Sequence, residues 1–346
     1  MTRKSEPRQP ANARRDQSPK LTVAVIGAGR LGSALSLAMR DAGHRVSIAV
    51  ARSSRSAKRA GTLLSTHGTA LGLKQLHQLR SADRKLIAQS DLILITTQDD
   101  SIPRVAGELA VMSELRAAAM RRPKPIALHT SGALTSEALN PLRQLGFAIG
   151  SMHPLMSISG EINQTQPFSG IHFSLEGDPA AIRLSRQLAR DLGGKSHLID
   201  GDSKPLYHAA AVMASPNVTA LIDIAIEMLS HCGLGLSQAR RMLLPLIQST
   251  VANLVKQNPR QALTGTFKRG DIDTVKVHLA AIASERLTDA LDAYTTLGSR
   301  SLTISGIPKS RRRRIEILMT EAADHYKVKP APTKRTTPAS KPARRN

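Results

Sequence analysis

Short apolar runs alternate with amphipathic segments through the first two thirds of the chain. The clearest runs are LTVAVI, HRVSIAV, SDLILI, KPIALH and FAIGSMH, and the segments GIHFSL and KSHLI extend the pattern. Uninterrupted apolar runs are typical of strands buried on both faces, and alternation of strand and helix is typical of a parallel sheet covered by helices on each side. The pattern therefore predicts an α/β fold with a doubly wound parallel sheet.

Near Ser203 the pattern changes to long amphipathic segments with few strand signals. The stretch KPLYHAAAVMASPNVTALIDIAIEMLSHCG is interpreted as one long helix, or as two helices joined at Pro216. Another helix is expected to follow Asp271, which has the right side chain to cap it. We therefore predict a doubly wound domain over residues 21–202 and an all-α domain over residues 203–308.

Much of the net charge of +23 lies at the two ends of the chain. Residues 1–20 carry six basic and two acidic residues, and residues 309–346 carry twelve and three. Their polar composition predicts a disordered basic tail at the N-terminus, and a basic helix followed by a disordered tail at the C-terminus. Solvated ends are the favoured interpretation, and weak polyanion contact through the tails is the alternative. No zinc-finger, RNP-type or basic-zipper pattern indicates a dedicated nucleic-acid binder.

Other simple features narrow the class of protein further. The single cysteine, Cys232, excludes an intrachain disulfide framework and is typical of a reducing, cytoplasmic compartment. No apolar run approaches the roughly 18 residues of a membrane span, so no membrane contact is expected. The 11 histidines include no H-x-H or H-x-x-x-H pair with nearby acids, so no metal site is predicted.

The first apolar run leads into a glycine motif that indicates a Rossmann-type nucleotide site. Gly27, Gly29 and Gly32 form G-x-G-x-x-G between a predicted strand and a predicted helix. The three glycines permit a tight turn, close approach of a pyrophosphate, and close packing of helix on strand. Arg30 and Leu31 then open the helix, whose N-terminus favours phosphate. We predict that this loop binds a dinucleotide; a glycine-rich turn without a ligand is the alternative.

The end of the second strand indicates which dinucleotide binds. An NAD site would place Asp or Glu there to hold the ribose 2′-hydroxyl. The sequence has AVARSSRSAKR instead, without an acid. Arg52, Ser53 and Arg55 offer a guanidinium and hydroxyl cradle for a 2′-phosphate. The predicted cofactor is therefore NADP(H).

Polar side chains follow three of the predicted strands at their carboxyl ends. Thr97 follows SDLILI, Ser131 follows KPIALH, and His153 ends FAIGSMH. Ligands of doubly wound sheets bind at this edge, so Thr97 is a candidate cofactor contact and the other two are candidate catalytic residues. A strand-end His153 that only bonds neighbouring backbone is the alternative. His129 is expected to point into the sheet edge.

A polar stripe runs along the first helix of the C-terminal half. Lys204, His208, Ala211 and Ser215 fall at i, i+4, i+7 and i+11, so they share one helix face. That face is either the solvent side of the helix or the wall of a cleft, and spacing does not distinguish the two.

Residues 21–305 resemble the bacterial NADP-oxidoreductase-like proteins that join a Rossmann domain to a helical domain of unknown function. The markers are GAGRLG, HTSGAL, GSMHPL, KPLYHAAAVMAS and ALTGTFKRGD. Pyrroline-5-carboxylate reductases, prephenate and arogenate dehydrogenases, and deazaflavin-dependent NADP reductases share the architecture. The chain departs from the pattern in two places, where the family usually has Asn at the Pro216 position and Pro at the Thr266 position. Asn217 is the candidate to replace the displaced asparagine.

The resemblance implies an NADP(H)-dependent oxidoreductase that acts on a C=O or C=N carbon of a small, carboxylate-bearing metabolite. Prephenate-type dehydrogenases place a serine about 21 residues before a His-Pro motif, and Ser131 and His153 stand 22 apart. By this resemblance His153 is the catalytic acid, with Ser131 orienting it or the nicotinamide amide, and His208 is the second candidate. The expected substrate contacts are Lys204, Asn217, Arg269 and Asp271.

The helical domain is expected to close the cleft and form a homodimer, as it does in similar enzymes. The alternative function is a non-catalytic NADP(H)-binding sensor or scaffold. Such a protein would keep the glycine loop and Arg52 but would have no use for His153.

Overall fold

The computed structural model describes residues 20–64, 69–72, 75–120, 123–159 and 167–327. The chain divides into two compact units at Ser215 and Pro216. The predicted boundary lay before helix α8 (Lys204–Ala214), which the division assigns to the sheet unit. Residues 1–19 and 328–346 lie outside the described residues, and so do the predictions of disorder for them.

The first unit contains an eight-stranded sheet with the strand order β3-β2-β1-β4-β5-β6-β7-β8. The β1–β4 and β4–β5 pairings are parallel, with register Val23↔Leu92 and Leu92↔Ile126. The order reverses between β1 and β4, as in a doubly wound sheet. The strands are β1 Thr22–Ile26, β2 Arg45–Ala51, β3 Thr69–Gly72, β4 Leu92–Ile95, β5 Ile126–His129, β6 Ala148–Pro154, β7 His172–Gly177 and β8 Lys195–Leu198.

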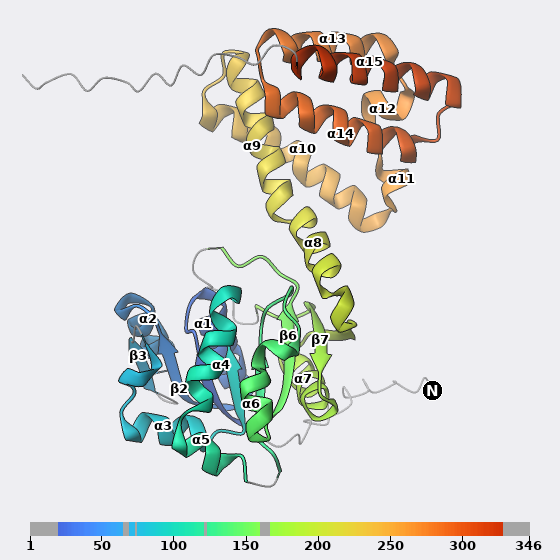
Figure 1. Cartoon of the computed structure of the whole chain (residues 1–346). Coiled ribbons are helices and arrows are strands. Elements are labelled where there is room, and N and C mark those ends of the chain that lie inside the picture. Colours follow the sequence, from blue (N-terminus) through green and yellow to red (C-terminus); the bar gives the residue numbers. More distant parts are fainter. Residues whose placement is uncertain (1–19, 65–68, 73–74, 121–122, 160–166, 328–346) are drawn as a thin grey trace, which may run out of the picture. The chain divides into compact units, whose positions relative to one another are not determined.

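Helices cover both faces of the sheet (Figure 1). The central strands are mostly apolar because each face meets helices: Val23 and Val25 of β1 join one buried cluster, and Ala24 and Ile26 join the other. The helices of this unit are α1 Arg30–Asp41, α2 Ser54–Leu64, α3 Ser81–Ala88, α4 Ile102–Ala110, α5 Ser113–Ala118, α6 Asn140–Leu145, α7 Pro179–Asp191 and α8. Four short 3-10 turns, η1 Leu76–Gln78, η2 Asp99–Ser101, η3 Ser136–Leu139 and η4 Gly201–Ser203, join them.

One pairing in the sheet is antiparallel. Strand β7 runs antiparallel to β6, with His153 opposite Ser174, and β8 then runs parallel to β7. Parallel neighbours need a crossover, usually a helix, and the described residues between β6 and β7 form no helix. The predicted doubly wound parallel sheet is confirmed, β7 and β8 extend it as expected, and the antiparallel direction of β7 was not predicted.

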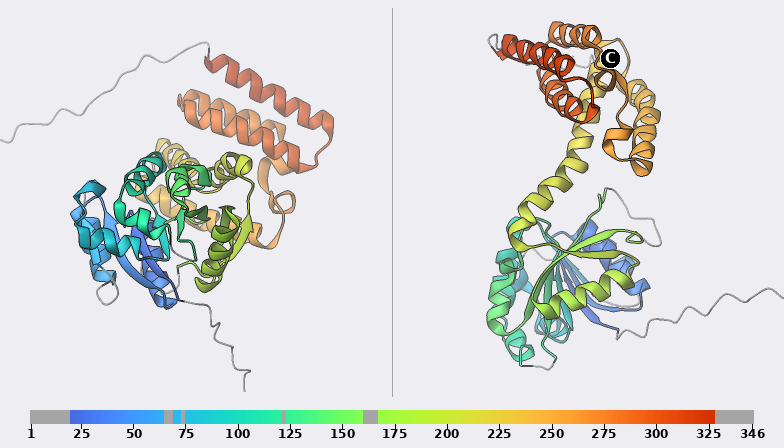
Figure 2. Two further views of the ribbon diagram at one scale, coloured as in Figure 1. Left: turned by 60° about the horizontal axis from the view of Figure 1, so that its bottom comes forward. Right: turned by 90° about the vertical axis from the view of Figure 1, so that its right-hand side faces the viewer.

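The second unit is helical throughout its regular structure. Helices α13, α14 and α15 share a core that includes Val275, Leu291 and Ile315, and α14 and α15 run side by side (Figure 2). The predicted basic C-terminal helix is thus part of this unit. The helices are α9 Pro216–His231, α10 Leu236–Lys256, α11 Pro259–Ala262, α12 Gly265–Arg269, α13 Ile272–Ser284, α14 Thr288–Ser305 and α15 Lys309–Lys327.

The helical stretch Gly201–His231 is long and apolar enough to cross a membrane, with a mean hydropathy of 1.6 over 18 residues. The sequence has no uninterrupted apolar run of this length, but the averaged hydropathy of this stretch passes the test for a membrane span. Isolated polar residues such as Ser215 and Asn217 interrupt the consecutive apolar run, so run length did not reveal it. The stretch meets the criteria for a membrane span by length and composition only, and one such helix is weak evidence for a membrane protein.

Candidate functional site

The glycine loop between β1 and α1 has the geometry of a phosphate-binding turn. Gly27 has φ +110°, and a Cβ there would lie 2.8 Å from the Thr96 carbonyl carbon. A Cβ on Gly32 would lie 2.4 Å from the Gly27 carbonyl oxygen, so α1 packs directly on the turn. A Cβ on Gly29 would meet only one atom, at 3.8 Å, which leaves space in front of the loop. Helix α1 begins at Arg30, and the N–H groups of a first helical turn lack intrahelical acceptors.

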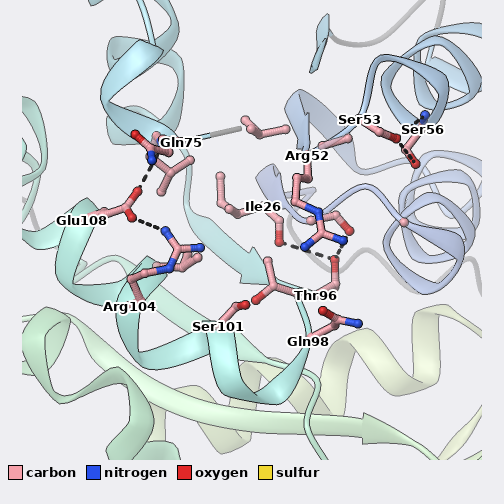
Figure 3. Close-up of a pocket in the computed structure, with 17 residues that line it drawn as sticks. Ile26, Arg52, Ser53, Ser56, Gln75, Thr96, Gln98, Ser101, Arg104 and Glu108 are labelled. Carbon is pink, nitrogen blue, oxygen red and sulfur yellow. Dashed lines mark hydrogen bonds and ion pairs between the residues drawn. The ribbon is translucent and has the colours of Figure 1, made fainter. Parts of the chain in front are cut away.

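A pocket of about 320 Å³ lies beside this loop, at the carboxyl ends of β1, β2 and β4 (Figure 3). Five predicted cofactor residues line it: Gly27, Gly29, Arg52, Ser53 and Thr97. Ser53 accepts a hydrogen bond from the Ser56 backbone N–H at 3.2 Å, so its hydroxyl also caps the start of α2. Arg30, Leu31, Gly32 and Arg55 were also predicted and lie outside the lining of this pocket. Gly32 instead shapes the turn.

The side of the pocket opposite Arg52 was not predicted from the sequence. Arg104 and Glu108 of α4 lie there with Gln75 (Figure 3). Glu108 is ion-paired with Arg104 and accepts a hydrogen bond from the Leu76 backbone N–H at 3.1 Å. These contacts tie η1 to α4 across the pocket. Their positions depend on which segments meet around the strand ends, and no local motif signals them.

One atom in the pocket wall supports a polar ligand there. Within the described residues, the Thr97 hydroxyl is buried and has no hydrogen-bond partner. Buried polar groups are normally satisfied. An unsatisfied hydroxyl next to an open glycine loop and the exposed guanidinium of Arg52 fits the polar groups of a dinucleotide.

A second group of polar residues lies at the carboxyl ends of β5 and β6 in the same unit. Ser131 donates a hydrogen bond to Asp99 Oδ2 at 2.7 Å and accepts hydrogen bonds from the backbone N–H groups of Ala133 and Leu134. The Ser131 hydroxyl thus holds the turn after β5 in shape. Asp99 was not among the predicted residues, although it comes two positions after Thr97.

His153 ends β6, as predicted, and its ring partner is a tyrosine rather than Ser131. The Nδ1 atom of His153 lies 2.9 Å from the hydroxyl oxygen of Tyr207 on α8. Burial, with His208 and Lys204 nearby, lowers the pKa of His153 to about 4, so its ring is neutral at pH 7. Burial also raises the pKa of Tyr207, which therefore stays protonated. Tyr207 directly precedes the predicted His208 in the sequence. This adjacency is the one sequence feature that could have pointed to Tyr207 as a site residue.

His208 comes close to His153 across a glycine. The two rings meet edge to face at 5.7 Å. A Cβ on Gly132 would lie 2.5 Å from His208 Nδ1 and 3.0 Å from His153 Nε2. In the described structure His208 Nδ1 is buried without a hydrogen-bond partner. The two imidazoles therefore present nitrogen atoms to one small space beside Gly132.

Lys204 lies beneath the strand ends rather than on the solvent side of α8. It is 1% exposed, and its ammonium donates to Ser151 Oγ at 2.7 Å and to the Ser131 carbonyl oxygen at 3.2 Å. Burial lowers its pKa, and the carboxylates of Glu176 and Asp99 oppose that effect. The stripe of Lys204 and His208 is therefore internal to this unit. Lys204 acts on the site through its charge, since its ammonium is already engaged.

The other predicted substrate residues belong to the helical unit. Asn217 lies in the first turn of α9. Arg269 Nε donates to Asp271 Oδ2 at 2.8 Å. Asp271 occupies the N-cap position of α13, as predicted, but makes no side-chain capping hydrogen bond, since its carboxylate pairs with Arg269. The structure thus brings together Ser131, His153, Lys204 and His208 in one unit and places the other three residues in the second.

His129 is fully buried. Its Nε2 atom lies 3.0 Å from the Thr135 carbonyl oxygen and its Nδ1 atom accepts from the Ser131 backbone N–H. Burial lowers its pKa to about 4, in agreement with the predicted packing role. Over the described residues, no group of three or more His, Cys, Asp or Glu side chains is placed to hold a metal ion.

The fold and the glycine loop define a Rossmann-type protein with a helical second unit. Comparison with family models agrees: residues 7–154 match the Rossmann-like domain, and residues 171–301 match DUF2520, a domain of unknown function. The chain therefore joins a Rossmann-like domain to a DUF2520 domain, and the resemblance noted from the sequence is confirmed. No curated protein matches the chain in sequence.

Solved structures share this fold at low sequence identity. A candidate NADP oxidoreductase from Bacteroides fragilis is 18% identical with a TM-score of 0.59, covering 88% of this chain and 98% of its own. A Thermotoga maritima protein is 21% identical with a TM-score of 0.53, covering 88% and 99%. A candidate oxidoreductase from Pseudomonas putida is 18% identical with a TM-score of 0.54, covering 90% and 94%. At these identities the likeness establishes the fold.

Proposed function

We propose that this protein is an NADP(H)-dependent oxidoreductase that transfers a hydride to or from a C=O or C=N carbon of a small, carboxylate-bearing metabolite. The observation that carries the proposal is the shared edge of one sheet. The open glycine loop and the Arg52 pocket lie at the ends of β1, β2 and β4, and the His153 group lies at the ends of β5 and β6. Ligands of doubly wound sheets bind along this edge.

The residues of the pocket have separate proposed roles in holding the cofactor. The glycine loop and the first turn of α1 hold the pyrophosphate. Arg52 holds the 2′-phosphate, since a guanidinium fork suits phosphate oxygens. The Thr97 hydroxyl supplies a further hydrogen bond near the strand end. When bound, the nicotinamide supplies or accepts the hydride.

The proposed role of the second group is to stabilise the substrate atom that gains negative charge. His153 is neutral at pH 7, so it acts as a hydrogen-bond donor to that atom. The buried ammonium of Lys204 adds positive potential, which favours developing negative charge and a carboxylate on the substrate. His208 faces the same space beside Gly132 and completes the polar wall.

The test of this function is a screen for NADPH oxidation with 2-oxo acids, aldehydes and cyclic imines. With an active substrate, His153→Ala is expected to lower kcat by about 10²–10³-fold, the contribution of one hydrogen-bond donor to a developing negative charge, while NADPH affinity stays unchanged. His197→Ala, which removes an exposed histidine of β8, is the matched control. NADPH binding with no turnover of any compound would favour the sensor or scaffold role instead.

We further propose that the protein is a cytoplasmic homodimer that assembles through α9 and α10. Exposed apolar side chains gather on these two helices, including Leu246 at 63% and Val255 at 80% exposure. Exposed apolar side chains in such number support an interaction site on these helices. The single cysteine supports a reducing compartment.

A further inference from the structure

The contact between Tyr207 and His153 fixes the position of the imidazole ring and also affects which of its nitrogen atoms is protonated. The two rings meet edge to face at 5.7 Å and 87°, and the hydroxyl oxygen lies 2.9 Å from Nδ1. Tyr207 comes from α8 and His153 from β6, so a helix and a strand of the same unit hold the pair. A single hydrogen lies between the two atoms. If the tyrosine hydroxyl donates it, the imidazole proton is on Nε2; if the imidazole donates it, that proton is on Nδ1.

The chemistry of the two groups decides the direction of the bond. A phenol hydroxyl is a good donor, and an imidazole nitrogen accepts a hydrogen bond better than a phenol oxygen does. Burial opposes charge on both rings, since it keeps the phenol protonated and the imidazole neutral. The arrangement of lowest energy therefore has the Tyr207 hydroxyl donating to His153 Nδ1.

We propose that Tyr207 is a positioning residue that holds His153 in the tautomer with its proton on Nε2. Nε2 lies next to Gly132, where a Cβ would be 3.0 Å away, so the N–H group faces the small space that His208 Nδ1 also borders. The inference rests on the proposed function for its use. It deepens that function, because a donor at Nε2 suits a carbonyl oxygen or imine nitrogen, whereas oxidation of an alcohol would require a lone pair there.

Other groups around the ring do not supply this bond. The charged and titratable neighbours of His153 are His129 on β5, Asp99 after β4, and Lys204, Tyr207 and His208 on α8. Asp99 is bonded to Ser131, and Lys204 to Ser131 and Ser151. Within the part of the chain that the structure describes, Tyr207 is the neighbour hydrogen-bonded to the His153 ring. Burial raises the pKa of Tyr207 and a hydrogen bond with Ser174 lowers it, so the Ser174 hydroxyl donates to the phenol oxygen and leaves the phenol hydrogen for His153.

The experiment is ¹⁵N NMR of the full chain labelled at histidine, recorded without cofactor or substrate. The His153 signals are assigned with His153→Gln. The expected spectrum shows a protonated Nε2 and an unprotonated Nδ1 at pH 7. In Tyr207→Phe, which removes only the hydroxyl, the two signals are expected to move towards the exchange average of free histidine. The titration midpoint of His153 is also expected to rise, because the hydroxyl no longer stabilises the neutral ring.

The chain contains a matched control. Tyr294 contacts His278 Nδ1 at 2.8 Å, with the rings edge to face at 5.8 Å, inside the helical unit. Tyr294→Phe should leave the His153 signals unchanged. Unchanged His153 signals in Tyr207→Phe, or a protonated Nδ1 in the wild-type chain, would overturn the proposal. Because NADPH binding is measured separately, loss of the proposed function would leave this result intact, and the reverse also holds.

Discussion

The two units of the chain use apolar side chains in opposite ways. In the sheet unit the strands β1 and β4 are buried almost completely, with Val23, Val25 and Ile95 at 0% exposure. In the helical unit none of the 16 residues of α9 is buried, and Ala239 is the one buried residue among the 21 of α10. The sheet unit thus builds its own core and holds its polar residues rigidly, while α9 and α10 present apolar surface.

The difference in burial between the two units explains why the candidate site lies in the sheet unit. Polar side chains need a packed surround to be held with altered pKa values and defined partners. Ser131, His153 and Lys204 have that surround at the ends of β5 and β6. The helical unit offers its own core around α13 to α15, and a surface suited to binding another chain.

The largest expected effect separates the two kinds of apolar residue directly. Ile95→Ala removes a fully buried side chain, so it should lower the free energy of unfolding of the sheet unit by about 2–5 kcal/mol. Val255→Ala removes an 80% exposed side chain and should change it by less than about 0.5 kcal/mol at protein concentrations where the chain is monomeric. Urea unfolding at low protein concentration measures both. A large loss of unfolding free energy in Val255→Ala would contradict the proposed difference between buried and exposed apolar side chains.

A smaller effect is expected in assembly rather than in folding. Leu246→Gln with Val255→Gln places two polar side chains on α10, and should shift the protein from dimer to monomer in sedimentation velocity. Val277→Gln is the control, because Val277 of α13 is also an exposed apolar residue, at 65% exposure. A wild-type chain that is monomeric at all concentrations would remove the basis for the proposed homodimer.

Much of the sheet unit followed from the sequence because its signals are local. The run from Leu21 to Ile26 predicted β1, the glycine motif predicted the turn and α1, and strand-end positions predicted where Ser131 and His153 lie. The break at Pro216 was also visible, because proline interrupts helix hydrogen bonding, and α8 ends at Ala214.

The features that the sequence did not predict depend on contacts between distant segments. The antiparallel β7 places Ser174 beside His153, and pattern alone does not set strand direction. The Tyr207 contact joins residues 54 positions apart. Helix α2 was missed because AVARSSRSAKR has few apolar residues, and Ser53 was considered for a phosphate rather than as the cap of α2.

The central claim is that the pocket beside the glycine loop binds NADP(H) through Arg52. The most direct measurement is a titration with NADPH and NADH that follows the fluorescence of the cofactor, since the chain has no Trp to interfere. Moderate salt limits non-specific attraction by the net charge of +23. Arg55→Ala, which lies outside the pocket lining, is the matched control.

NADPH is expected to bind more tightly than NADH. Arg52→Ala should weaken NADPH binding by about 10–150-fold, since a hydrogen-bonded charge contributes roughly 1.5–3 kcal/mol, and should leave NADH binding almost unchanged. Arg55→Ala should have little effect on either cofactor. Two results would contradict NADP(H) binding through Arg52. One is equal affinity for both cofactors that does not change in Arg52→Ala, and the other is no binding of either cofactor.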